Sequence, residues 1–172
     1  MYKVAYMMRF DAEKKSGGDL GQIKNYITHG KSLGLFEGEL ICGKNFNIND
    51  FDIVHLTNID RPVDLWFYYK IAKSAKKPIV ISAIHHSYSE INRYEKIARV
   101  GLLKFLNIFN SFQSLEKIRS IARCAQDFRL IFPTFDCLKF GMLDCQKEVI
   151  KNCDLLLTLT KKEYCDILED FS

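Results

Sequence analysis

The sequence predicts an α/β protein, a Rossmann-like parallel sheet sandwiched between helices, with a helical insertion at about residues 89–135. Short buried apolar runs alternate with amphipathic helical patterns, and glycine or proline separates several of them. Apolar residues make up 48% of the 172 positions, which suffices for a sizeable core. We therefore expect residues 1–172 to form a single domain.

The first strand is expected at residues 3–8, and a helix follows after a short loop. Asp19 is the expected N-cap of this helix, with Gln22 as its capping-box partner. Apolar residues recur at helical spacing until Gly34, which fits the C′ position at a helix end. Residues 39–42 predict a weaker second strand.

The third strand is expected at residues 51–56, because the sequence FDIVHL is β-branched and nearly continuously apolar. Asp60 and Pro62 then open a helix, as its N-cap and an early-turn proline. Pro78 marks the end of that helix, and residues 79–84 predict a fourth strand.

The second half of the chain is mostly helical in pattern. We expect two or three helices within residues 89–128, another at 136–152, and a last strand at 154–159. Thr160 and Glu163 form a capping box for a final helix. In parallel sheets of this kind, ligands bind at the carboxyl ends of the strands, so the segments that follow the strands are the candidate site.

Two adjacent glycines, Gly17 and Gly18, lie between the first strand and the first helix. Glycine lets backbone approach a ligand closely, and a helix N-terminus attracts anions. Their spacing fits neither GxGxxG nor GxxxxGK[ST], so neither of these nucleotide motifs is present. From this segment alone, a simple turn and a ligand-binding loop stay equally open.

The order and spacing of several segments resemble the N-terminal domain of GT-B glycosyltransferases. The segments are SGGDLGQI, FDIVHLTNIDRP, KKPIVISAIHH and CDLLLTLTKKEYCDIL. The resemblance is greatest to retaining enzymes of family four that build bacterial surface polysaccharides, and it covers the chain outside residues 89–135. It implies an acceptor-binding half of a hexosyltransferase. The donor-binding C-terminal domain is absent from this sequence, so the isolated half is expected to be inactive.

The resemblance also implies ligands and contacts. The donor is a nucleotide-sugar, the acceptor is a glycan or a polyprenyl-linked sugar, and no metal or other cofactor is expected. Ser16, Gly17 and Gly18 are expected to contact the donor phosphate or sugar, the glycines through backbone N–H groups.

His85 and His86 follow the fourth strand and are the candidate catalytic residues. A near-neutral imidazole can exchange a proton or hydrogen-bond a sugar hydroxyl, and family members often place a histidine there. Adjacent strand residues face opposite sides, so we expect at most one of the two in the cleft and prefer His86. The alternative is a polar loop in which one histidine caps the strand end.

Asn58, Asp60 and Arg61 follow the third strand and are the candidate acceptor-binding residues. The favoured alternative for Asp60 is helix capping alone. His55 lies within the strand, where a hydrogen-bonded core histidine is more common than a catalyst.

Asp50 and Asp52 match the D-x-D motif of metal-dependent sugar transferases of another fold. The motif precedes a strand here, at the wrong end of the sheet, so no metal site is expected. The six cysteines form no CxxC pair, and no signal peptide is evident. We therefore expect the cysteines to be reduced thiols with a packing role in a cytoplasmic protein.

Residues 89–131 hold eight cationic and four acidic side chains, an excess that equals the +4 of the whole chain. A basic helix with apolar residues suits an anionic membrane surface. Peripheral binding at the inner membrane face is therefore one prediction for this segment. The favoured alternative is an ordinary helical layer packed on the core. The mild net charge gives no reason to expect nucleic acid as a partner.

Two functions from different classes follow. The first is the acceptor-side half of a retaining glycosyltransferase, and the second is a non-catalytic Rossmann-like module that recruits a catalytic partner or a membrane acceptor. A flavodoxin-like nucleotide-binding domain is a weaker third, because the phosphate loop of such proteins is absent.

Overall fold

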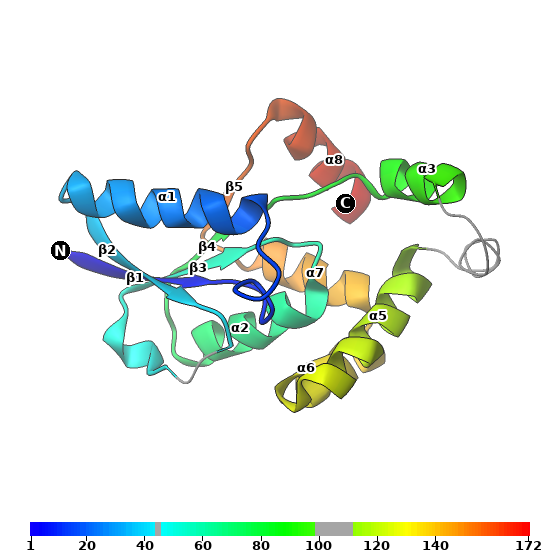
Figure 1. The fold of residues 1–172 in the computed structure, drawn as a ribbon, viewed down its shortest axis with the longest axis horizontal. Helices are drawn as coiled ribbons and strands as arrows, with labels where there is room; N and C mark the ends of the chain where they lie inside the picture. Colours follow the sequence, from blue (N-terminus) through cyan, green and yellow to red (C-terminus); the bar gives the residue numbers. More distant parts are fainter. Residues whose placement is uncertain (44–45, 99–111) are drawn as a thin grey trace.

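The computed structural model describes residues 1–43, 46–98 and 112–172. Within them the chain is an α/β protein with a five-stranded parallel sheet flanked by helices, consistent with a Rossmann-like fold (Figure 1). The strand order is β2-β1-β3-β4-β5. The strands are β1 (Tyr2–Met7), β2 (Phe36–Ile41), β3 (Ile53–Thr57), β4 (Ile79–Ser82) and β5 (Leu155–Leu157).

The helices occupy both faces and one end of this sheet. They are α1 (Gly18–Ser32), α2 (Pro62–Ser74), α3 (Tyr88–Ala98), α5 (Phe112–Gln126), α6 (Ile131–Phe140), α7 (Met142–Lys151) and α8 (Lys161–Phe171), with short 3₁₀ turns η1 (Ile48–Asp50) and η2 (Phe128–Leu130). Figure 1 shows α1 on one side of the sheet, α2 and α7 on the other, and α5 and α6 beyond one end.

Two apolar layers hold the sandwich together. On one face, Leu20 and Ile23 of α1 pack on Val4 and Tyr6 of β1. The larger layer on the other face joins α2 and α7 to the alternate residues of β1, β3 and β4. Its buried members include Ala5, Met7, Val54, Leu56, Leu65, Tyr68, Tyr69, Ala72, Ile79, Ile81 and Val149. Because both faces of the central strands are covered, their sequences are almost continuously apolar.

The helix starts differ from the sequence prediction at two carboxylates. Gly17 is the N-cap of α1 and makes no side-chain cap bond, so the prediction of Asp19 as the cap was wrong. Gln22 hydrogen-bonds Tyr26 instead of closing a capping box. Arg61, not Asp60, is the N-cap of α2, although Pro62 lies at the predicted early position. In both cases the carboxylate pairs with side chains from other segments, as described below.

Two glycines end helices. Gly34 has φ +66 directly after the last turn of α1, which confirms it as the C′ residue. Gly141, with φ +103, separates α6 from α7, so the single helix expected at residues 136–152 is wrong. The helical insertion expected at 89–135 is present as α3, α5 and the start of α6, and residues 99–111 lie outside the described part.

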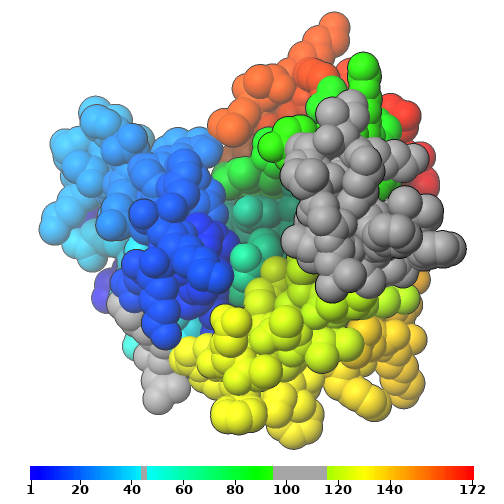
Figure 2. Space-filling view, turned by 45° about the vertical axis from the view of Figure 1, so that its right-hand side comes forward, coloured from blue at the N-terminus to red at the C-terminus, as the bar shows by residue number. Residues whose placement is uncertain are grey.

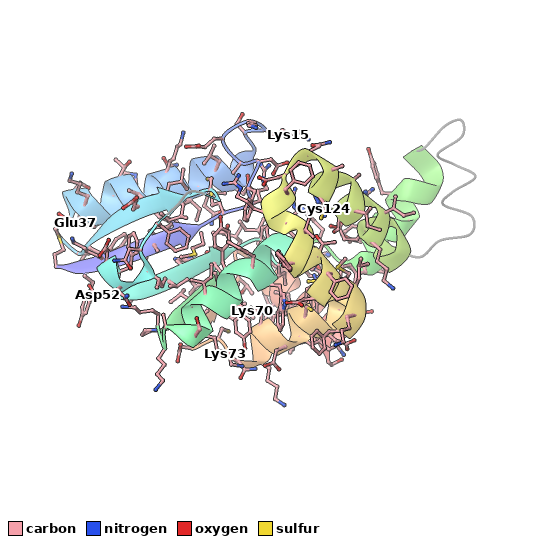
Figure 3. The ribbon with its side chains drawn as sticks, turned by 90° about the horizontal axis from the view of Figure 1, so that it is seen from below. Lys15, Glu37, Asp52, Lys70, Lys73 and Cys124 are labelled. Carbon is pink, nitrogen blue, oxygen red and sulfur yellow. The ribbon has the colours of Figure 1, made fainter. Side chains whose placement is uncertain are left out.

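Two further predictions, one about a helix cap and one about the amino ends of the strands, are confirmed. Thr160 caps α8, and its hydroxyl accepts a hydrogen bond from the Glu163 amide. Asp52 lies at the amino ends of the strands, where its carboxylate accepts a hydrogen bond from the Lys3 amide. Figure 3 shows Asp52 and Glu37 at the end of the sheet away from the loop that carries Lys15.

Candidate functional site

The strand order places the candidate site at the carboxyl ends of β1 and β3. The chain runs outward in one direction from β1 to β2 and in the other from β1 through β3 and β4 to β5. Such a reversal leaves a crevice between the loops that follow the two central strands, here residues 8–17 and 58–61. The fold is consistent with a Rossmann-like α/β protein, and this crevice at its topological switch point is the candidate site.

The glycine loop reaches this crevice, but its two glycines have different surroundings. A Cβ on Gly17 would lie 2.8 Å from the Asp19 carboxylate, whereas a Cβ on Gly18 would meet nothing within 4 Å. Neither glycine has a positive φ. Ser16 and both glycines are exposed. The open main chain that a ligand could approach therefore begins at Gly18.

Arg9, which the sequence analysis did not single out, organises the glycine loop. Its guanidinium donates to the Asp19 carboxylate at 2.9 Å, to Asp11 at 3.0 Å and to the Lys15 carbonyl at 2.5 Å. Burial alone would raise the pKa of Asp19, but the hydrogen bonds from Arg9 and from the Leu20 amide hold it below its ordinary value. The sequence could have indicated Arg9, because this residue follows a buried strand at the carboxyl edge of the sheet, where ligands bind.

The loop after β3 binds the loop after β1 across the crevice. The Arg61 guanidinium contacts Asp11 at 3.2 Å and Asp64 at 3.2 Å. Asn58 has φ +65, and its side chain hydrogen-bonds Asp19. The structure thus brings Asn58 and Arg61 to the same crevice as the glycine loop. Asparagine tolerates the left-handed conformation better than most residues.

Asp60 reaches the segment after β4 instead of capping α2. One carboxylate oxygen lies 2.6 Å from Nδ1 of His85, and the other accepts the His86 amide at 3.0 Å. Asp170, near the end of α8, lies 3.0 Å from Nε2 of His85. The imidazole is therefore held between two carboxylates, and its side chain is fully buried.

This arrangement gives His85 a structural part in the site. Burial favours the neutral ring, but the hydrogen bonds and charges of Asp60 and Asp170 outweigh burial and raise the pKa of His85 above its ordinary value. Both ring nitrogens are engaged by these carboxylates. No sequence signal pointed to Asp170, because it lies 85 positions from His85 and only the packing of α8 joins them.

His86 follows His85 in the loop after β4 and differs from it in exposure. It is exposed and lines a hollow of about 300 Å³ that also includes Glu90, Lys162 and Asp166. Ile84, which precedes the pair, has φ +47. A β-branched residue is rarely found there, and such strain tends to occur at functional sites. The structure thus turns His85 inward and leaves His86 accessible.

His55 is confirmed as a hydrogen-bonded core residue. It is 6% exposed, its Nε2 lies 2.8 Å from the Ser82 hydroxyl, and its ring stacks on Tyr6. Burial lowers the pKa of His55 to about 4.

Among the described residues, no group of three His, Cys, Asp or Glu side chains is placed to hold a metal ion. In the same part of the chain, no helix has the length and apolar composition needed to cross a membrane. The chain matches no protein-family model, no curated protein and no solved structure.

Proposed function

We propose that this chain is the acceptor-side domain of a GT-B glycosyltransferase, which moves a sugar from a nucleotide-sugar to a glycan or lipid-linked acceptor. The observation that carries the proposal is the placement of Gly18 and His86 at one edge of the sheet. Gly18 follows β1 and His86 follows β4, and one strand separates β1 from β4. At the usual strand spacing the carboxyl ends of β1 and β4 are about 10 Å apart, within the span of a nucleotide-sugar.

The proposed chemistry assigns each segment a part. The open main chain at Gly18 approaches the donor phosphate at the N-terminus of α1, where helix amides favour an anion. His86 hydrogen-bonds or exchanges a proton with a sugar hydroxyl. Asn58 and Arg61 face the acceptor, and Asp60 positions the histidine pair. Leaving-group stabilisation is the main demand of such a transfer, and a second domain would supply most of it.

The proposal includes a peripheral position at the cytoplasmic face of a membrane. Part of the expected surface, residues 99–111, lies outside the described chain. In the described part, Ile118, Ile121 and Phe128 are exposed. Exposed apolar side chains next to basic ones support binding to an anionic bilayer.

The first test compares His86 with a histidine away from the site. We expect His86→Ala to lower sugar transfer at least about tenfold, because a proton or hydrogen-bond partner is lost. His29→Ala is the control, because His29 is exposed on the last turn of α1. The measurement is transfer of radiolabel from nucleotide-sugars to extracted lipid and glycan, using the gene product at its natural full length. Equal activity of the two variants would remove His86 from the site.

Gly18 provides the second test. Gly18→Val should lower transfer at least about tenfold because the new side chain blocks close approach of the phosphate. Gly21→Val is the matched control, since a Cβ at either glycine meets nothing within 4 Å and both lie in α1. The two variants should have equal melting temperatures. Acceptor binding without transfer from any nucleotide-sugar would contradict the enzyme proposal and favour the recruiting module.

A further inference from the structure

A second hollow at the carboxyl edge, of about 320 Å³, is here called the basic cavity. It lies between the β1–α1 loop, the end of β2 and the junction of α5 with η2, and its cationic lining is Lys14, Lys15, Arg61, Arg123 and Arg129. In Figure 2 the blue N-terminal loop and the yellow-green part of α5 and η2 lie side by side. Figure 3 labels Lys15 on that loop and Cys124 on α5.

The lining carries more positive than negative charge. Its five cations face three carboxylates, those of Asp11, Glu13 and Asp127, which leaves an excess of two positive charges. Asp11 alone is shared by Arg9, Lys15 and Arg61. Asp64 and Glu116 behind the wall pair with Arg61 and Arg123, so the positive charge at the surface of the cavity comes mainly from the exposed Lys14 and Lys15. These ammonium groups favour an anionic ligand.

Buried carboxylates behind the wall fix two of the arginines. Asp64, 3% exposed, holds Arg61, and Glu116, 6% exposed, pairs with Arg123. The Nε of Arg123 is buried and has no hydrogen-bond partner among the described residues. A buried N–H usually has an acceptor, so the guanidinium of Arg123, which lines the cavity, keeps one unmet donor. A guanidinium held in place loses little freedom when an oxyanion binds.

Arg129 forms the wall and takes little part in binding. Its donors are engaged by the Asp127 carboxylate and the Gly43 carbonyl, and its guanidinium lies 5.1 Å from the centre of the Phe10 ring. The groups left to contact a ligand are Lys14, Lys15, Arg61 and Arg123.

The size of the basic cavity fits a small anionic group. Its volume of about 320 Å³ is near the lower limit of small-molecule pockets, about 300–1,000 Å³. Phe128, which is 76% exposed, lies in the sequence between two lining residues, Asp127 and Arg129.

We propose that the basic cavity binds the phosphate or diphosphate group of a phosphorylated ligand. Two fixed guanidiniums and two flexible ammonium groups suit its oxygens, since arginine binds phosphate in a bidentate way and lysine as a point charge. That this phosphate belongs to the sugar acceptor rests on the proposed function. Phosphate binding itself does not.

The test measures binding of inorganic pyrophosphate by calorimetry. Lys14→Gln/Lys15→Gln should raise the dissociation constant at least about tenfold, because the variant loses two charge-assisted hydrogen bonds to the phosphate oxygens. Both lysines are exposed, so the fold is not at risk. Lys24→Gln/Lys31→Gln on α1 is the matched control with the same charge change, and it should bind as the wild type does. Equal weakening in both variants, or no binding by the wild type, would overturn the proposal.

A second arm tests the guanidinium. Arg123→Gln should also weaken pyrophosphate binding at least about tenfold, whereas Arg93→Gln on the exposed surface of α3 should not. Circular dichroism shows whether Arg123→Gln folds. If it does not, the lysine pair decides. A folded Arg123→Gln with wild-type affinity would contradict the proposed site.

A third arm identifies the source of the phosphate. Phosphatidylcholine vesicles with and without polyprenyl phosphate are sedimented with the protein. Binding that requires polyprenyl phosphate and is displaced by pyrophosphate supports a lipid-borne group. Pyrophosphate binding without vesicle binding supports a soluble phosphorylated ligand. A full-length protein that binds pyrophosphate but transfers no sugar would contradict the proposed function and leave the phosphate site standing. Sugar transfer without pyrophosphate binding would contradict the phosphate site alone.

Discussion

At the scale of single residues, two buried histidines have pKa values shifted in opposite directions. His55 lies against Tyr6 and Ser82, and burial lowers its pKa to about 4. His85 lies between Asp60 and Asp170, which raise its pKa despite burial. The same type of side chain thus serves as a hydrogen-bonded core group within β3 and, after β4, as the group that joins the segments of Asp60 and Asp170.

These pKa shifts predict that the two histidines lose their contributions to stability in opposite directions of pH. Unfolded His55 takes up a proton near pH 6.5 but folded His55 only near 4, so its contribution falls as pH drops through that window. His85 contributes fully below 6.5, and the contribution is lost as pH rises through its elevated folded pKa. Stability should therefore be greatest near pH 6.5.

The measurement is the free energy of unfolding in urea from pH 4.5 to 9. His85→Gln should cost about 3 kcal/mol at pH 6 and less at pH 9, because removing one member of a buried charge cluster strands the others. His29→Gln, on the surface, should leave the profile unchanged. A larger loss at pH 9 than at pH 6 would show that His85 is not a cation in the folded protein.

At the scale of elements, two helices end in the same hydrogen-bond pattern with different residues at C′. Gly34 follows α1 with φ +66, and the Leu35 amide donates to the Gly30 carbonyl. Lys76 follows α2 with φ +54, and the Lys77 amide donates to the Ala72 carbonyl. Only glycine adopts this conformation without strain, so α2 ends at an energetic cost that α1 avoids.

Exchanging these C′ residues should have opposite effects. Lys76→Gly should stabilise the protein by about 0.5–1 kcal/mol, after the greater entropy of glycine in the unfolded chain is subtracted. Gly34→Lys should destabilise it by about 1 kcal/mol. Thermal and urea unfolding of the two variants measure both changes, and each variant is the reverse control of the other. Shifts in the same direction would contradict the strain argument.

At the scale of the whole molecule, the strand order decides both stability and site. β1, β3 and β4 have neighbours on both sides, whereas β2 and β5 are the edges. β5 is three residues long, and its Leu155 and Leu157 are exposed. The most protected strands therefore carry the loops of the switch-point crevice, which gives the candidate site a rigid base.

Hydrogen exchange tests this ordering. Amides of β1 and β3 should exchange slowest, because they open only with the whole sheet, and those of β5 should exchange faster. Mass spectrometry of peptides that cover each strand gives the rates, and β2, the opposite edge, is the internal comparison. Exchange in β5 as slow as in β3 would show that the edge is covered by a partner in solution.

The sequence by itself determined the fold class, the approximate strands, the Gly34 helix end and the Thr160 cap, because each depends on local periodicity or local backbone conformation. It also located the candidate segments, since the carboxyl-end rule needs only the order of elements. Tertiary structure decided the partners. Asp19 and Asp60 read as helix caps, but in the fold they pair with Arg9 and His85, and the basic cavity joins residues about 110 positions apart. A charge takes the most favourable partner that folding brings near, and no local pattern records which distant side chain that will be.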